Sequence, residues 1–176
     1  MNYKPAWSDD YTIHSYESDK SSRATPIALL QYMQESAWQH AEHLDLGYSH
    51  LAPKGLAWVL SRLSIEIANL PHWREQITVK TWPSGRDKLF AHRDFRISSS
   101  NGQEQAIGST SWIVIDQKRR RPQRTDSYFH IEPWDAERVF PEFTGKVSAV
   151  NRVDALNTRS VYFSHLDVNG HVNNVK

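Results

Sequence analysis

Close to the carboxyl end, a short run of polar side chains has the residue types needed for acid–base chemistry. Asp167, Asn169 and His171 stand at alternate positions and supply a carboxylate, an amide and an imidazole. Brought together in one small volume, they provide a candidate base, an amide that orients water or a carbonyl, and a donor whose charge can be tuned. Spacing alone favours a structural turn around Asn169-Gly170, because both residue types are turn formers.

The segment that carries Asp167 resembles one near the amino end. Ser15–Asp19 aligns with Phe163–Asp167, and each reads as a strand that runs into a polar turn. In the same register, Ser21, Arg23 and Thr25 correspond to Asn169, His171 and Asn173. The first copy leads into a long helical pattern. We therefore expect a second helix beyond Lys176, whose free N–H groups could hold a developing oxyanion.

The long helix begins at Thr25-Pro26, where a capping residue precedes a proline whose missing N–H costs nothing. The spacing predicts a helix over about residues 26–45, with Gly47 as a left-handed cap. Its apolar face is predicted to hold Ile27, Leu30, Met33, Ala37, Trp38, Ala41 and Leu44. Gln34 falls within this face, so its amide is expected to need a partner.

After the helix, the apolar residues alternate with polar ones, which indicates strands. Strand patterns occupy residues 11–17, 57–67, 76–82, 89–98 and 103–116. Turns are predicted at Trp82–Gly85 and at Asn101-Gly102, a pair that favours a β-hairpin. An antiparallel sheet is therefore expected to wrap the helix in an α+β layer, and Gly108 would let the helix approach closely.

Composition excludes several classes of function. The 176 residues carry 21 Lys and Arg against 20 Asp and Glu, so the net charge of +1 gives no globally basic surface for nucleic acid. Without cysteine, these residues form no disulfide, thiolate–metal site or cysteine nucleophile. No stretch approaches the roughly 20 apolar residues of a membrane span. Residues 1–11 show neither a signal nor a transit peptide, so we expect a cytoplasmic protein.

Several separated motifs resemble those of one family. Asp167–Asn174 is similar to the active-site motif of the acyl-acyl carrier protein (acyl-ACP) thioesterases. The segments that agree elsewhere are Arg23–Pro26, Leu29–Glu35, Trp58–Arg62, Ile77–Arg86 and Arg93–Phe95. Several motifs in the right order are much harder to meet by chance than one motif, and the similarity extends from about Tyr11 to the last residue.

This resemblance implies a double hot dog protein, in which each α+β domain wraps an antiparallel sheet around a long central helix. Residues 1–130 would be a complete amino-terminal hot dog domain that shapes the acyl pocket, and residues 131–157 a linker region. Residues 158–176 would begin a truncated catalytic domain, with a strand at Thr158–Phe163. The implied reaction is hydrolysis of acyl-[acyl carrier protein] to a free fatty acid and the carrier protein in fatty acid biosynthesis, without a cofactor.

Carried over residue by residue, Asp167, Asn169 and His171 match the catalytic residues of the family. A further acidic or thiol residue of the family lies beyond the end of this chain. The mechanism expected is direct attack by water, with Asn169 and His171 positioning the water and the thioester. Asp167 is either the base or the group that orients the other two side chains. In the second case the residue beyond Lys176 is the base or nucleophile.

Two further sets of residues are candidates for substrate contacts. A basic run could dock the acidic carrier protein, although a solvated loop explains it equally well. Its residues are Lys118, Arg119, Arg120, Arg121 and Arg124. Gln34, Trp38 and Trp58 are candidates for the acyl pocket, although large residues on core faces usually just pack.

Metal binding and a non-catalytic function are the competing interpretations. His40 and His43 share a helical face without a third ligand at recognisable spacing, so we expect exposed helix histidines and no metal. The alternative function is a non-catalytic hot dog module that binds acyl chains or thioesters, which does not require Asp167, Asn169 and His171. A nucleic-acid partner is not expected, and a homodimer is left open.

Overall fold

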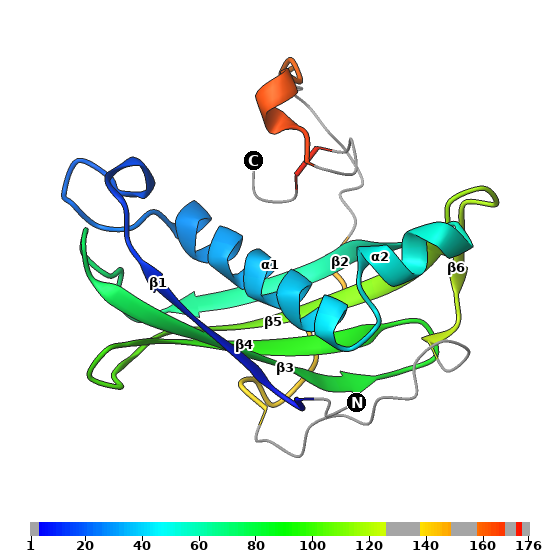
Figure 1. Ribbon diagram of the computed structural model, residues 1–176, viewed down its shortest axis with the longest axis horizontal. Helices are drawn as coiled ribbons and strands as arrows, with labels where there is room; N and C mark the ends of the chain where they lie inside the picture. Colours follow the sequence, from blue (N-terminus) through cyan, green and yellow to red (C-terminus); the bar gives the residue numbers. More distant parts are fainter. Residues whose placement is uncertain (1–3, 126–137, 149–157, 168–171, 174–176) are drawn as a thin grey trace.

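The computed structural model describes residues 4–125, 138–148, 158–167 and 172–173. One long helix, α1 (Pro26–His43), lies in the hollow of a curled antiparallel sheet (Figure 1). The short helix α2 (Tyr48–Leu51) follows it towards one end of the sheet. Among the described residues, no helix combines the length and the apolar character that a membrane crossing requires.

Both ends of α1 are set by local sequence. The Thr25 hydroxyl accepts a hydrogen bond from the Ala28 N–H at 3.2 Å, which confirms the predicted start. The helix ends at His43, earlier than expected. Asp45, with φ of 57°, takes the left-handed conformation that was predicted for Gly47. Asp is among the few residue types that visit this conformation readily, so the chain turns without a glycine at the cap.

The buried face of α1 is rotated from the predicted apolar face. Ile27 is 51% exposed, whereas Leu29, Tyr32 and His40 are buried. Several members of the predicted face line a cavity on one flank of the helix, together with the predicted amide: Gln34, Ala37, Trp38, Ala41 and Leu44. A helix in a curved sheet is covered on more than one side, so apolar spacing marks the cavity wall as well as the core.

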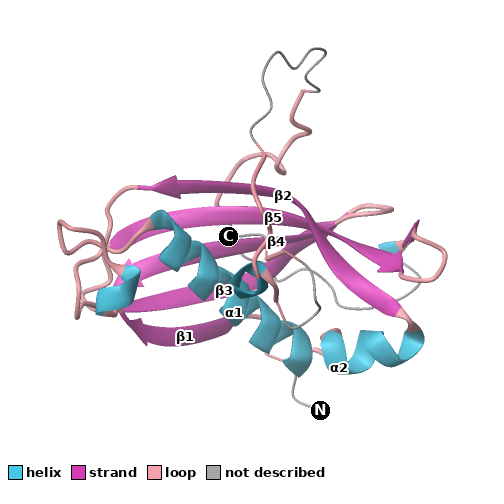
Figure 2. Cartoon of the chain, turned by 90° about the horizontal axis from the view of Figure 1, so that it is seen from above, coloured by secondary structure: helices cyan, strands magenta, loops and turns pink. Residues whose placement is uncertain are grey.

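The sheet contains six antiparallel strands. In chain order they are β1 (Trp7–Thr12), β2 (Leu56–Ile67), β3 (Gln76–Arg86), β4 (Ala91–Ser99), β5 (Glu104–Asp116) and β6 (Arg121–Gln123). The spatial order of the first five is β1-β3-β4-β5-β2 (Figure 2), and β6 pairs with β5. The hairpin predicted at Asn101-Gly102 joins β4 to β5, with Gly102 at φ of 84°.

Two predictions at the strand ends are wrong. Within residues 11–17 the sheet ends at Thr12, and Ser15–Glu17 form a 3-10 helix, η1. The Glu17 carboxylate accepts hydrogen bonds from the His14 N–H at 2.8 Å and from the Tyr32 hydroxyl, which hold the chain in a turn. At Trp82–Gly85, β3 continues through an irregular register with β4 instead of turning.

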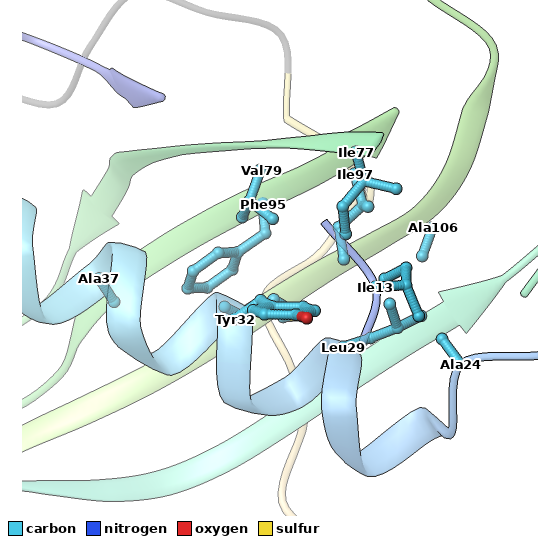
Figure 3. Packing of buried hydrophobic residues seen from close by; sticks show 11 residues of the cluster. Ile13, Ala24, Leu29, Tyr32, Ala37, Ile77, Val79, Phe95, Ile97 and Ala106 are labelled. Carbon is cyan, nitrogen blue, oxygen red and sulfur yellow. The ribbon is translucent and has the colours of Figure 1, made fainter. Parts of the chain in front are cut away.

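The main core lies between α1 and the concave face of the sheet. Figure 3 shows Leu29 and Tyr32 of α1 among buried side chains of the strands, including Phe95 of β4. Gly108 of β5 lies against the end of the Met33 side chain of α1, as the sequence predicts for a residue that faces the helix. A Cβ at this position would lie 2.5 Å from Met33 Cε, closer than real Cβ contacts allow.

Segments that follow β6 lie on both sides of the sheet (Figure 1). On the face opposite α1, the Phe143 ring stacks on His92 with centroids 3.6 Å apart. On the helix side, Phe163–His165 form a second 3-10 helix, η4. The strand predicted at Thr158–Phe163 is wrong, and the Val161 side chain is 60% exposed. A strand needs a pairing partner for its backbone, and the described residues offer this segment none.

Candidate active site

A cavity of about 230 Å³ opens between α1, α2 and one end of the sheet. Its walls come from α1 and α2, from the segment that joins them, and from β2, β3, β4 and β5. Apolar and aromatic side chains dominate, among them Leu46, Leu51, Leu56, Trp58 and Trp112. A concave apolar cavity with a few polar groups is typical of a site for a small ligand with a large apolar portion.

The three residues predicted for the acyl pocket meet at this cavity. Gln34 and Trp38 reach it from α1, and Trp58 reaches it from β2. The Trp58 indole donates to the Leu46 carbonyl oxygen at 2.8 Å and meets the Trp112 ring edge to face, with centroids 6.5 Å apart. These contacts fix the orientation of the Trp58 ring, so the aromatic wall is preformed.

Of the predicted catalytic residues, Asp167 lies at the same cavity. It lines the wall together with Val172, which forms an isolated antiparallel bridge with Leu166. Asn169 and His171 lie outside the described residues. The structure therefore brings one predicted catalytic residue to the predicted acyl pocket.

The internal repeat is confirmed by the backbone. The 3-10 helices η1 (Ser15–Glu17) and η4 (Phe163–His165) occupy equivalent positions, and each is followed by an isolated bridge. These bridges are Ser18 with Ala24 and Leu166 with Val172. The Thr25 N–H donates to the Glu17 carbonyl at 2.8 Å, and the Asn173 N–H donates to the His165 carbonyl at 2.9 Å. The described residues on either side of the turn therefore make the same contacts in both copies.

In the first copy, the residue equivalent to Asp167 shapes the turn. One oxygen of the Asp19 carboxylate accepts hydrogen bonds from the Ser21 N–H at 2.7 Å and from the Arg23 N–H at 3.1 Å. A short carboxylate that binds backbone N–H groups two and four residues ahead stabilises a turn locally. The acceptor is a single carboxylate oxygen, which an amide oxygen could replace.

Sequence reasoning missed a polar cluster at the wall of the cavity. His40 is fully buried, so the prediction of an exposed helix histidine is wrong. Its Nε2 lies 2.9 Å from the Lys4 carbonyl oxygen, and its Nδ1 lies 2.9 Å from Nη1 of Arg93. The same Nη1 donates to Thr81 Oγ1 at 3.2 Å. The spacing of residues along the helix placed His40 on the same face as His43, but it could not show that His40 contacts Arg93 on a strand of the sheet.

Burial determines the charges in this cluster. It lowers the pKa of His40 to about 4, and the nearby positive charge of Arg93 adds to the effect. His40 is therefore neutral at pH 7, with Nε2 donating to Lys4 and Nδ1 accepting from Arg93. Burial lowers the pKa of Arg93 to about 10, so the guanidinium keeps its charge. The cluster thus carries one positive charge.

The basic run lies on the turn between β5 and β6, on β6, and just beyond it. Lys118, Arg119, Arg120, Arg121 and Arg124 are all exposed. The Arg119 N–H donates to the Asp116 carboxylate at 2.8 Å, which closes the turn. None of the five basic residues lines the cavity. The described ranges contain no cluster of three His, Asp or Glu side chains that could hold a metal ion.

The sequence also matches a known domain family. The profile of the acyl-ACP thioesterase N-terminal domain matches residues 4–130, which is most of the chain. The chain belongs to the acyl-ACP thioesterase family. This match covers α1, α2 and the whole sheet.

Curated proteins that are similar in sequence to this chain are named as acyl carrier protein thioesterases. The chloroplastic palmitoyl-acyl carrier protein thioesterase of Gossypium hirsutum is 29% identical, and the alignment covers 97% of this chain and 45% of that protein. The chloroplastic oleoyl-acyl carrier protein thioesterase 1 of Arabidopsis thaliana is 24% identical, with 97% and 52% covered. This acyl-ACP thioesterase chain therefore spans about half the length of the curated relatives it matches.

Solved structures confirm the α+β hot dog fold. An acyl-ACP thioesterase from Bacteroides thetaiotaomicron superposes with a TM-score of 0.77 at 26% identity, covering 97% of this chain and 70% of the other. The 12:0-ACP thioesterase from Umbellularia californica superposes with a TM-score of 0.79 at 20% identity, covering 99% and 73%.

Proposed function

We propose that this acyl-ACP thioesterase chain takes part in hydrolysing acyl-[acyl carrier protein] to a free fatty acid and the carrier protein in fatty acid biosynthesis. One observation carries the proposal. Asp167, from the motif near the carboxyl end, lines the cavity that also holds Gln34, Trp38 and Trp58. Hydrolysis of a fatty acyl thioester needs polar side chains next to the thioester and an apolar cavity for the alkyl chain, and here the two lie at the same place.

The proposed division of labour follows the internal repeat. Residues 1–130 form a hot dog domain that holds the acyl chain, and residues 131–157 link it to a catalytic domain that begins at residue 158. In the reaction, water adds to the thioester carbonyl carbon, the C–S bond breaks, and the thiol of the carrier leaves with a proton. Asn169 and His171 position the water and the thioester.

Within this proposal, Asp167 is a positioning residue. Its equivalent, Asp19, accepts hydrogen bonds from the N–H groups of Ser21 and Arg23, the residues that correspond to Asn169 and His171. The same contacts in the second copy would present the amide and the imidazole to the substrate. The base or nucleophile then belongs to the part of the protein beyond residue 176.

The test measures thiol release from acyl carrier thioesters by the full-length protein. Asn169→Ala and His171→Ala should each lower turnover by about 100-fold or more, because both side chains act on the reacting groups. The repeat supplies matched controls. Ser21→Ala and Arg23→Ala change the equivalent positions of the first copy and should leave turnover near the wild-type value.

Two outcomes would contradict the proposal. Near-normal hydrolysis in both Asn169→Ala and His171→Ala would remove these residues from the mechanism. A wild-type full-length protein that binds acyl thioesters without releasing thiol would instead support the alternative, a non-catalytic acyl-binding module.

The compartment and the assembly are also proposals. The cytoplasm is the proposed location, whereas the plant relatives are named chloroplastic. Cell fractionation with an antibody against the protein tests the location. The proposed assembly is a homodimer, and sedimentation of the full-length protein tests it.

A further inference from the structure

Besides Arg86 and Asp167, the wall of the cavity carries the guanidinium of Arg93, a charge that a hydrocarbon chain does not need. Arg93 of β4 lines the cavity beside the aromatic residues Trp58 and Trp112. Placing a guanidinium against an apolar slot costs free energy unless an anion or several acceptors compensate for it. The position of Arg93 therefore calls for a ligand with a matching group.

Within the described residues, no carboxylate neutralises Arg93. Its hydrogen-bond partners are His40, which is neutral, and Thr81, and both contact the same nitrogen, Nη1. The adjacent carboxylate, Asp94, is fully buried and contacts other groups. It accepts from the hydroxyls of Ser84 and Ser109 at 2.8 Å each. Successive side chains of a strand point to opposite faces, so Asp94 lies on the other side of the sheet from Arg93.

The remaining donors of Arg93 suit a carboxylate. A guanidinium presents N–H groups in a planar fork that matches two carboxylate oxygens, and such pairs are among the strongest hydrogen bonds in proteins. His40 and Thr81 hold one corner of the fork, which fixes its orientation. Gln34 lines the same cavity from α1 and adds an amide that can donate to an oxygen.

We propose that this cavity is a binding site for fatty acid anions, with the carboxylate paired to Arg93 and the alkyl chain lying against Trp58 and Trp112. The inference rests on the proposed function only in that a fatty acid is the product of that reaction. Binding itself requires no catalysis. A neutral thioester cannot form the same ion pair, so the site distinguishes product from substrate by charge, and accumulated product would occupy the acyl cavity.

The test is a calorimetric titration of the 176-residue chain with three ligands of equal chain length: decanoate, decanol and methyl decanoate. At pH 7.5 the wild-type chain should bind decanoate at least about tenfold more tightly than either neutral ligand, because only decanoate pairs with the guanidinium. Arg93→Met keeps a long apolar side chain and removes the charge. It should bring the three affinities within about threefold of one another by weakening decanoate alone.

Arg96→Met is the matched control. Arg96 lies on the same strand, is exposed, and pairs with Glu104 at 2.8 Å, so its loss should leave the preference for decanoate unchanged. Equal affinities for the three ligands in the wild-type chain would overturn the proposal, and this comparison stands even if Arg93→Met does not fold. A preference that survives in folded Arg93→Met would overturn it as well. Binding of the neutral ligands without preference leaves the proposed acyl cavity intact, whereas no binding of any ligand contradicts both.

Discussion

Packed side by side, the buried His40 and the partly buried Arg93 carry one positive charge between them at neutral pH. Burial lowers the pKa of both, to about 4 for His40 and about 10 for Arg93. The pH range between these values keeps the imidazole as an acceptor and the guanidinium as a donor. This complementarity is a property of the packed state, because an exposed histidine has a pKa near 6.5.

The stability of the fold should therefore depend on pH through His40. Its folded pKa is depressed, so its stabilising contribution is complete above about pH 6.5, falls as the pH decreases towards 4, and changes no further below that. Between pH 7.5 and pH 5 this one group should cost about 2 kcal/mol. We expect the wild-type chain to lose that much more unfolding free energy than His40→Gln, measured by urea denaturation at both pH values. Equal losses would show that His40 does not titrate in this way.

At the scale of elements, apolar periodicity predicted the long helix and most of the sheet. It gave the wrong secondary structure where a single contact with another element determines the backbone conformation. The cap at Thr25 and the hairpin at Gly102 could be predicted because their causes are local. The strand predicted at 11–17 is wrong because Tyr32, on α1, helps to hold Glu17 in a turn. The cluster of His40 and Arg93 joins a helix to a strand, and no spacing within either segment reveals such a pair.

The turn that carries Asp167 yields a prediction about that element. If Asp167 acts by holding the turn, Asp167→Asn keeps an oxygen that can accept the backbone N–H groups, whereas Asp167→Ala removes it. In the full-length protein Asp167→Ala should lower turnover by about 100-fold through misplaced catalytic side chains, and Asp167→Asn should recover most of that loss. Thiol release measures both. A base could not be replaced by an amide, so equally inactive variants would assign Asp167 to proton transfer.

For the whole molecule, charge is local rather than global. The net charge is only +1, yet Lys118, Arg119, Arg120 and Arg121 follow one another on the exposed turn and strand after β5. A local basic patch can steer an acidic partner without a basic surface overall. The patch lies apart from the cavity wall, so under the proposed function it would be free to contact the carrier while the cavity holds the acyl chain.

Reversing the charge of this patch separates carrier docking from chemistry. In the full-length protein, Arg119→Glu combined with Arg120→Glu should raise KM for carrier-bound substrates by about tenfold and leave kcat and small acyl thioesters unaffected. The double variant Arg119→Lys and Arg120→Lys keeps the charge and serves as the control. An equal rise in KM for both kinds of substrate would place the effect outside carrier recognition.

The matching 3-10 helices and isolated bridges at the two ends of the chain indicate that the two segments have a common origin. The described residues of both copies make equivalent main-chain contacts, although their side chains differ at most equivalent positions. Duplication of a single ancestral gene accounts for this symmetry. Under the proposed function, it would also explain why equivalent positions hold Ser21 and Arg23 in one copy and Asn169 and His171 in the other.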